Sequence, residues 1–181
     1  MGSVEITTSF NTKELFTVAH SAWNTILCAE LCGNLSRYDG VHFGRRAEGV
    51  TDLKELYIRS RSEGFGKLTK SAIIYGSYAL TETEDGQLYA KAVRARDYIN
   101  EKLNAVFDTV DAIIIPACST PIYTAEDVEG GRITTFKENF YTALPSLLGL
   151  PAVTVAGAQI IGKPLSDSIL ITLAEKIEAA R

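Results

Sequence analysis

The sequence of 181 residues predicts an α/β protein in which helices cover a mixed sheet in an α/β/α layered arrangement. Two observations predict this class. Long segments repeat apolar residues at three- and four-residue spacing, as amphipathic helices do. Short runs of apolar and β-branched residues stand between them, as strands of an α/β fold do. The length suits a single domain over residues 1–181 with a sizeable core.

The first long helix is expected over residues 15–31. Its apolar positions include Trp23, which we expect to be largely buried against the sheet. Gly33 and Asn34 fit the C-terminal end of this helix, because both tolerate the left-handed conformation that closes a helix. A tight turn at Asp39 and the glycine after it then changes the direction of the chain.

Four other segments precede the clearest strand. A short β-prone stretch lies at residues 4–8, and a second helix, capped by Thr51-Asp52, is expected to end near Gly64. Residues 68–80 mix Ala, Ile, Tyr and Leu, and this composition alone predicts neither a helix nor a strand. A long helix is predicted over residues 87–110, where the apolar positions again have helical period.

The clearest strand is the run DAIIIP at residues 111–116, which is typical of a buried central strand. We expect Ile113 and Ile115 in the same core as Trp23, and we expect Ile114 to be as costly to truncate as Ile115. Open α/β sheets bind ligands beyond the carboxyl ends of their strands. The segment 117–121 is therefore a candidate part of a site.

The C-terminal part continues the alternation of helices and strands. Residues 126–133 are glycine-rich and acidic and are predicted to form an exposed loop. A helix over 136–148 is expected to kink or restart at Pro145. Two further strands and a closing amphipathic helix are expected at 153–155, 159–161 and 166–180.

Composition narrows the class of protein. The formal charge of −4 and the pI near 5.3 argue against broad binding of a nucleic-acid backbone, so direct nucleic-acid binding is not expected. No segment approaches the ~20 apolar residues of a membrane helix, and no membrane association is expected. The N-terminal sequence has no features of a signal peptide, so we expect a cytoplasmic protein.

Cysteine and histidine do not form a metal-binding pattern. Cys28 and Cys32 stand one helical turn apart beside apolar residues, where packing is the expected role. Cys118 is a single further thiol. His20 and His42 are each expected to be structural. We predict no metal site and no cofactor.

Several motifs resemble those of a known family. The segment GNLSRYDGVHFG at residues 33–44 resembles SNLSRYDGVRFG of the amidase-signature family. Similar agreement follows in family order at DAIIIP (111–116), LGLPAV (148–153) and QIIGK (159–163). The resemblance covers nearly the whole chain and corresponds to the C-terminal half of the amidase-signature fold.

The resemblance implies amide hydrolysis, but it also implies that the catalytic residues lie outside this sequence. Members of the family use a Ser-Ser-Lys arrangement, and no Gly-Ser-rich nucleophile loop like theirs occurs in this sequence. A serine without a base in hydrogen-bond reach is inert, so no catalytic residue is assigned. The expected partners are a chain that supplies the amidase N-terminal half or other amidotransferase subunits. A noncatalytic scaffold or binding protein that keeps the fold is the alternative.

The resemblance also suggests substrate-contacting residues and two departures. An arginine pair of the family is replaced by Ser71 and Ala72, and a family aspartate corresponds to Asn139. A purely structural role of these residues is the alternative. Arg37 and Asp39 would then form a local ion pair and turn, and Gln159 would form hydrogen bonds with backbone groups. The candidate substrate-binding residues are Arg37, Tyr38, Asp39, Thr120, Asn139 and Gln159.

A half of a layered sheet exposes an open edge and an apolar face. We therefore expect a homodimer or a partner contact through the surface around Arg37, Tyr38 and residues 116–121.

Overall fold

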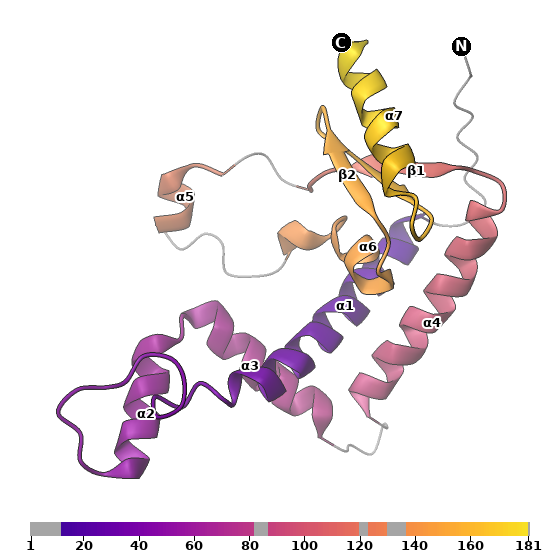
Figure 1. Cartoon of the computed structure of the whole chain (residues 1–181). Helices are drawn as coiled ribbons and strands as arrows, with labels where there is room; N and C mark the ends of the chain where they lie inside the picture. Colours follow the sequence, from indigo (N-terminus) through magenta and orange to yellow (C-terminus); the bar gives the residue numbers. More distant parts are fainter. Residues whose placement is uncertain (1–11, 82–86, 120–122, 130–136, 181) are drawn as a thin grey trace. The chain divides into compact units, whose positions relative to one another are not determined.

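The computed structural model describes residues 12–81, 87–119, 123–129 and 137–180 (Figure 1). The chain divides into two compact units. Of the described residues, unit 1 holds 12–23, 94–119 and 137–180, and unit 2 holds 24–81, 87–93 and 123–129. The single domain expected over residues 1–181 stays a prediction. The strand expected at residues 4–8 lies outside the described residues.

Helices make up most of the described chain. They are α1 (Thr12–Leu35), α2 (Leu53–Gly64), α3 (Lys67–Leu80), α4 (Leu88–Phe107), α5 (Ala125–Glu129), the 3₁₀ helix η1 (Lys137–Asn139), α6 (Ala143–Leu148) and α7 (Asp167–Ala179). Across the described residues, no helix combines the length and the apolar composition that a membrane span requires. The predicted cap of α2 is confirmed, because the Asp52 carboxylate accepts a hydrogen bond from the Glu55 amide at 2.8 Å.

The end of α1 differs from the prediction. The helix runs through Gly33 and Asn34 to Leu35, and Gly33 is not left-handed. The Ser36 hydroxyl donates to the Gly33 carbonyl at 2.6 Å, and the Arg61 guanidinium donates to the Leu35 carbonyl at 2.8 Å. Side chains from beyond the helix thus satisfy its last carbonyls, so the helix needs no left-handed glycine to end.

Unit 2 is built on the close approach of α3 to the second half of α1. A Cβ atom at Gly76 would lie 2.9 Å from the Cys32 Cβ and still closer to the Cys28 carbonyl group. The Thr25 and Tyr75 hydroxyls form a hydrogen bond of 2.9 Å between the same two helices. Cys28 is buried as expected, and this burial raises the pKa of its thiol.

Unit 1 contains a three-stranded sheet of β1 (Ala112–Pro116), β2 (Ala152–Val155) and β3 (Ala158–Gly162), in the order β1-β3-β2. The α/β class is confirmed. The expected mixed sheet is antiparallel among the described strands, because β2 and β3 form a hairpin and β3 also runs antiparallel to β1. Ala156 and Gly157, at φ 51° and 82°, form the two-residue turn that this hairpin requires.

The prediction of β1 as a buried central strand is wrong for the described sheet. β3 is central and β1 lies at an edge. Ile115 belongs to the main core and Ile113 packs against that core, as predicted, whereas Ile114 is 42% exposed. The apolar run shows that a strand is suited to burial, but it does not show which neighbours it has.

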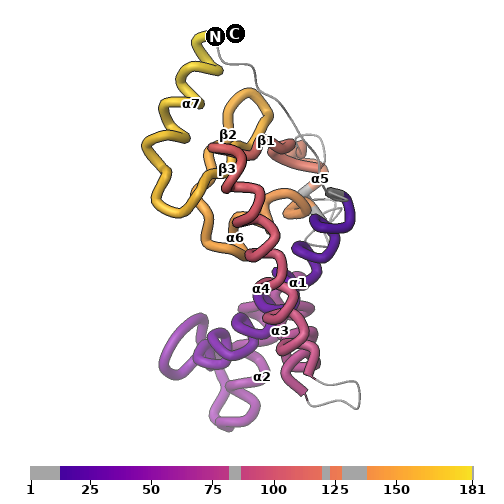
Figure 2. Tube along the Cα trace, turned by 90° about the vertical axis from the view of Figure 1, so that its right-hand side faces the viewer, coloured from indigo at the N-terminus to yellow at the C-terminus, as the bar shows by residue number. Residues whose placement is uncertain are grey.

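Each face of the sheet has its own core. One face joins residues of α1, α4 and α6 in a cluster that consists of Phe16, Ala19, Ile99, Leu103, Phe107, Ile115, Leu144 and Ile161. On the other face Ile160 and Val155 pack against Leu170 and Ala174 of α7. Figures 1 and 2 both show α7 alongside this small sheet.

Three further expectations differ in part from the structure. Trp23 is mostly buried, but it belongs to neither described core cluster of the sheet, so the core that it was expected to share with Ile113 and Ile115 is not found; its ring lies 5.9 Å from that of His20.

Residues 137–148 do not form one continuous helix: η1 ends at Asn139 and α6 begins at Ala143. The expected restart at Pro145 is confirmed, because Pro145 lies in the first turn of α6, where a missing N–H leaves no bond unmade. Residues 125–129 form the short helix α5, although an exposed loop was expected from residue 126; residues 130–133 lie outside the described residues.

Candidate functional site

The candidate substrate-binding residues fall in both units. Arg37, Tyr38 and Asp39 follow the end of α1 in unit 2. Asn139 ends η1 and Gln159 lies on β3, both in unit 1. Thr120 lies outside the described residues. The three unit 2 residues lie in the segment 36–47, which we call the 36–47 loop and treat as the candidate site.

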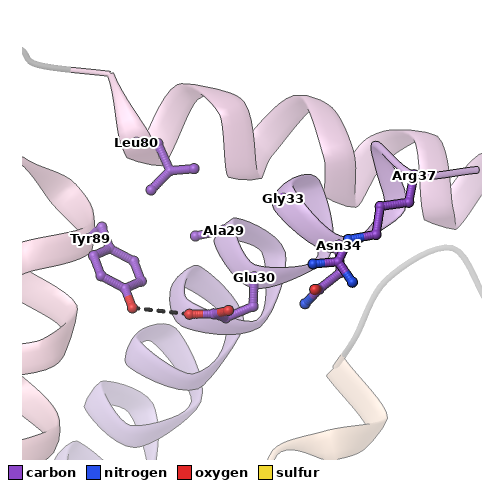
Figure 3. A pocket seen from close by; sticks show the side chains of 7 residues that line it. All are labelled: Ala29, Glu30, Gly33, Asn34, Arg37, Leu80 and Tyr89. Carbon is purple, nitrogen blue, oxygen red and sulfur yellow. Dashed lines mark hydrogen bonds between the residues drawn. The ribbon is translucent and has the colours of Figure 1, made fainter.

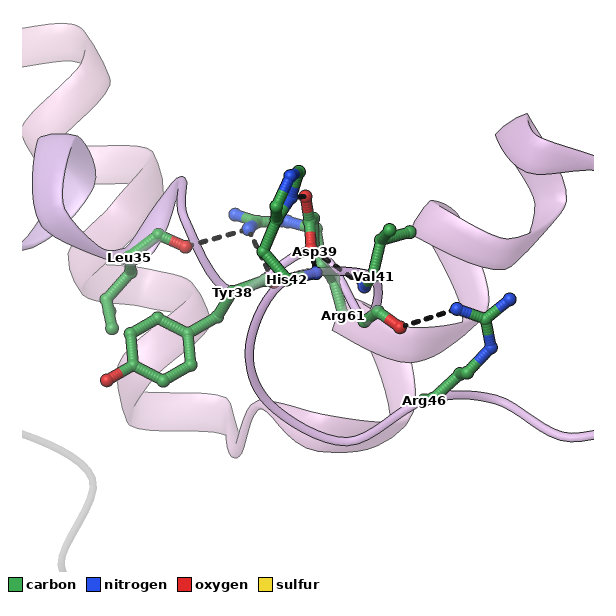
Figure 4. A network of polar contacts seen from close by, with 8 residues as sticks. Leu35, Tyr38, Asp39, Val41, His42, Arg46 and Arg61 are labelled. Atoms are coloured by element: carbon green, nitrogen blue, oxygen red, sulfur yellow. Dashed lines mark hydrogen bonds and ion pairs between the residues drawn. The ribbon is translucent and has the colours of Figure 1, made fainter.

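Asp39 organises the first turn of the 36–47 loop (Figure 4). One carboxylate oxygen accepts hydrogen bonds from the Val41 and His42 amides at 2.8 and 2.9 Å. The other oxygen lies 2.9 Å from Nδ1 of His42. The His42 ring and these two amides hold the pKa of the Asp39 carboxyl below its ordinary value, because each stabilises the charged form.

Two residues of α2 fix the 36–47 loop. The Arg61 guanidinium donates to the carbonyls of Leu35 at 2.8 Å and of Tyr38 at 3.1 Å (Figure 4). The buried Ser60 hydroxyl accepts a hydrogen bond from the Ala47 amide at 3.0 Å. Gly40 packs directly on Ser60 at φ 80°, where a Cβ would lie 2.6 Å from the Ser60 Cβ. Only glycine meets both demands at this position.

The expected ion pair between Arg37 and Asp39 is not found among the described contacts, because Asp39 pairs with His42 instead. Tyr38 is 46% exposed and its ring lies 6.4 Å from that of Phe43. Since Asp39 holds the backbone of the turn, the side chains of Arg37 and Tyr38 remain available at the surface.

Arg37 also lines a surface pocket of about 480 Å³. Glu30 and Tyr89, which are hydrogen-bonded to each other at 3.2 Å, lie toward one end of the pocket, and Asn34 lies beside Arg37 toward the other (Figure 3). The lining is completed by Ala29, Gly33 and Leu80. The sequence prediction did not include Glu30 and Tyr89; the one-turn spacing from Glu30 to Asn34 on α1 is the signal that relates Glu30 to the predicted site.

The two candidates of unit 1 have different surroundings. The Asn139 amide nitrogen donates to the Thr142 hydroxyl at 3.3 Å. Gln159 is 6% exposed, and its Oε1 atom has no hydrogen-bond partner among the described residues. The expectation that Gln159 satisfies backbone groups therefore finds no support for this oxygen. A buried acceptor without a partner is uncommon in folded proteins.

Asp39 of the 36–47 loop is poorly suited to act as a general base. Asp39 is a weak base because its pKa is lowered, and both of its oxygens already accept hydrogen bonds. Ser71 and Ala72, which replace a family arginine pair, contribute no charge: the Ser71 hydroxyl donates to the Lys67 carbonyl and Ala72 is buried. Within the described part of the chain, no group of three or more His, Cys, Asp or Glu side chains is placed to hold a metal ion.

Comparison with known proteins decides the family. The family model "Amidase" matches residues 8–170. The chain belongs to the amidase family. This match confirms the family that the motifs of the 36–47 loop and of the strands predicted.

Two curated relatives with the same name illustrate the similarity. The chain is 34% identical over 169 residues to the A subunit of glutamyl-tRNA(Gln) amidotransferase from Clostridium botulinum (strain Eklund 17B / Type B), covering 88% of this amidase chain and 35% of the relative. The A subunit of the same name from Natranaerobius thermophilus is 36% identical over 170 residues, covering 88% and 34%. The chain therefore spans about a third of the length of the curated relatives it matches.

Solved structures agree on the fold of this amidase chain. A structure described as "Crystal structure of amidase" matches 71% of the chain with a TM-score of 0.51 at 23% identity, over 32% of that protein. A single-residue variant of the allophanate hydrolase of Kluyveromyces lactis matches 95% of the chain with a TM-score of 0.54 at 16% identity, over 30% of that protein. The described elements thus correspond to part of the amidase-signature fold.

Proposed function

We propose that this chain is the substrate-contacting, non-nucleophilic part of a glutamine-hydrolysing amidase of the amidotransferase A-subunit type. The main support for this proposal is the sequence identity of 34 to 36% to A subunits of glutamyl-tRNA(Gln) amidotransferase, over 84 to 88% of this chain. In the proposed reaction the glutamine amide is hydrolysed in the cytoplasm, and the ammonia is used by a partner subunit to form Gln-tRNA.

The proposal assigns the nucleophile and its base to another segment or to a separate chain. The sequence contains no Gly-Ser-rich loop of the Ser-Ser-Lys type. Asp39 is excluded as a base by its lowered pKa and by its three hydrogen bonds. The described site instead offers a guanidinium at Arg37 and a phenol at Tyr38, groups suited to bind and orient a carboxylate or an amide. Thr120, Asn139 and Gln159 remain proposed contacts.

The test uses the chain co-expressed with the part of the Natranaerobius thermophilus A subunit that it does not match. We expect Arg37→Ala to raise the KM for glutamine in this complex by about tenfold or more, because a lost charge-assisted hydrogen bond is worth roughly 1.5–3 kcal/mol. Arg59→Ala is the matched control, since Arg59 is an exposed arginine that pairs with Glu63. Equal KM values for the two variants would remove Arg37 from the site.

A noncatalytic scaffold is the second candidate function. It is favoured by the absence of charge at Ser71, Ala72 and Asn139, where the family resemblance expects charged substrate contacts. The same complex separates the two proposals. Stable assembly without any ammonia release from glutamine supports the scaffold, whereas ammonia release supports the amidase.

A further inference from the structure

The surface pocket on α1 contains two opposite charges that do not pair with each other. Glu30 and Arg37 both line it, and no ion pair joins them among the described contacts. The Glu30 carboxylate accepts a hydrogen bond from the Tyr89 hydroxyl at 3.2 Å, whereas the Arg37 side chain has no hydrogen bond or ion pair with the described residues. The pocket therefore offers a carboxylate and a guanidinium to the same ligand.

Side chains from three helices form the pocket (Figure 3). Glu30, Asn34 and Arg37 follow one another at four- and three-residue spacing, so they lie along one side of α1 and its C-terminal end. Tyr89 and Leu80 reach the pocket from α4 and α3. Its volume of about 480 Å³ lies within the range of roughly 300–1,000 Å³ that small-molecule sites occupy. The pocket is therefore large enough for a small ligand that contacts both charges.

Gly33 keeps the pocket open between these charges. It lies between Glu30 and Arg37 on the same side of α1 and lines the pocket. Its φ is not positive and a Cβ atom there would meet nothing within 4 Å, so neither the backbone nor packing demands glycine. Glycine weakens a helix, and the family motif SNLSRYDGVRFG has serine at this position. The missing side chain thus leaves space that the motif residue would reduce.

We propose that this pocket binds a small zwitterion, an amino acid whose ammonium group contacts Glu30 and whose carboxylate contacts Arg37. A simple anion would lie near the like charge of Glu30 and a simple cation near that of Arg37, so a ligand with both charges is favoured. The Asn34 amide is a further hydrogen-bonding group, and Leu80 offers apolar contact to the carbon chain. Arg37 is also a proposed contact of the amidase substrate, but binding in this pocket needs neither a nucleophile nor hydrolysis. The site thus goes beyond the proposed function and can be tested on the chain alone.

Titration of the ¹⁵N-labelled full chain, followed by ¹H–¹⁵N NMR, tests the site. The probes are glycine, β-alanine and γ-aminobutyrate, whose two charges are increasingly far apart, and butyrate and n-propylamine, which carry one charge each. At equal ionic strength, at least one amino acid is expected to shift the amides of residues 29–37 and of Tyr89 saturably, with an affinity roughly tenfold or more above that of either singly charged probe. Equal affinity for butyrate would indicate an anion site, equal affinity for n-propylamine a cation site, and the absence of saturable shifts an ordinary surface; each result overturns the inference.

A change of charge locates the ammonium group. Glu30→Gln removes the charge but keeps the size of the side chain, and it is expected to weaken binding of the amino acid by roughly tenfold while butyrate binds no more weakly. Glu101→Gln is the matched control, since Glu101 is an exposed carboxylate of α4 that does not line the pocket. Equal affinities of these two variants for the amino acid overturn the inference.

A change of volume locates the ligand. Gly33→Leu adds a side chain where a Cβ meets no other atom, and it is expected to abolish the saturable shifts while the chain unfolds at no lower temperature by circular dichroism. Retained binding in this variant would place the ligand elsewhere and overturn the inference. Amino-acid binding without ammonia release from the complex leaves this site intact and overturns the proposed amidase function, whereas ammonia release without amino-acid binding by the chain does the reverse.

Discussion

Gly76→Ala is expected to destabilise unit 2 although alanine favours helices. Gly76 lies in the interior of α3, where replacing glycine gains up to about 1 kcal/mol of helix propensity. The added Cβ would lie 2.5 Å from the Cys28 carbonyl carbon and 2.9 Å from the Cys32 Cβ. Most of the nearest atoms belong to the backbone of α1, which cannot change conformation as a long side chain can. The added methyl group would therefore force α1 and α3 apart.

Overpacking of this kind costs roughly 1–3 kcal/mol, and a backbone clash belongs at the upper end of that range. The net loss after the gain in propensity is about 2 kcal/mol. For a unit of this size that loss lowers the melting temperature by roughly 8–15 °C. Thermal melts followed by circular dichroism in the far ultraviolet measure it.

Gly33→Ala is the control for this prediction. Gly33 is also helical, its φ is not positive, and a Cβ there meets nothing within 4 Å. We expect this substitution to raise the stability by up to about 1 kcal/mol. If Gly76→Ala melts at or above the temperature of the unmodified chain, the close approach of α1 and α3 is refuted.

Three further predictions concern single residues. Ile160→Ala should cost about 2–5 kcal/mol in urea denaturation and Ile114→Ala less than about 1, because only Ile160 is fully buried; equal losses would contradict the edge position of β1. The pKa of Asp39 should lie below its ordinary value of 3.8 in a ¹³C NMR titration, so the stability that this carboxylate contributes is present above that pH and is lost as the pH falls; His42→Ala should raise this pKa toward 3.8. An ordinary pKa of Asp39 in the unmodified chain would contradict the hydrogen bonds of the turn. Gln159→Leu should leave the urea midpoint unchanged or raise it, since Oε1 has no partner among the described residues, and a loss above about 1 kcal/mol would show that it has one.

Local signals in the sequence predicted much of the fold. The capping by Asp52, the hairpin strands and the closing helix α7 follow from residues close together in the chain. The edge position of β1 depends on pairing with distant residues, which its apolar run does not specify. The end of α1 was misplaced because Arg61, which is distant in sequence, satisfies the Leu35 carbonyl.

Helix α3 went unassigned although the sequence carried a signal. Its buried face consists of the small residues Ala72, Gly76 and Ala79, at helical spacing. Small residues give a weak apolar pattern, but they allow close packing of helices. Their three- and four-residue spacing is therefore the signal that predicts this helix. In the candidate site, the motif predicted a turn at Arg37, Tyr38 and Asp39. The suggested pairing of Asp39 with Arg37 differs from the structure, because the turn after Asp39 places the His42 ring 2.9 Å from its carboxylate.

Ammonia release from glutamine tests the central claim most directly. The purified chain alone is expected to release no more ammonia than a heat-killed control, and its complex with the unmatched part of the Natranaerobius thermophilus A subunit is expected to release it at a measurable rate. Ammonia release by the chain alone, abolished by substitution of one of its serines, would contradict the claim that the nucleophile lies outside these 181 residues.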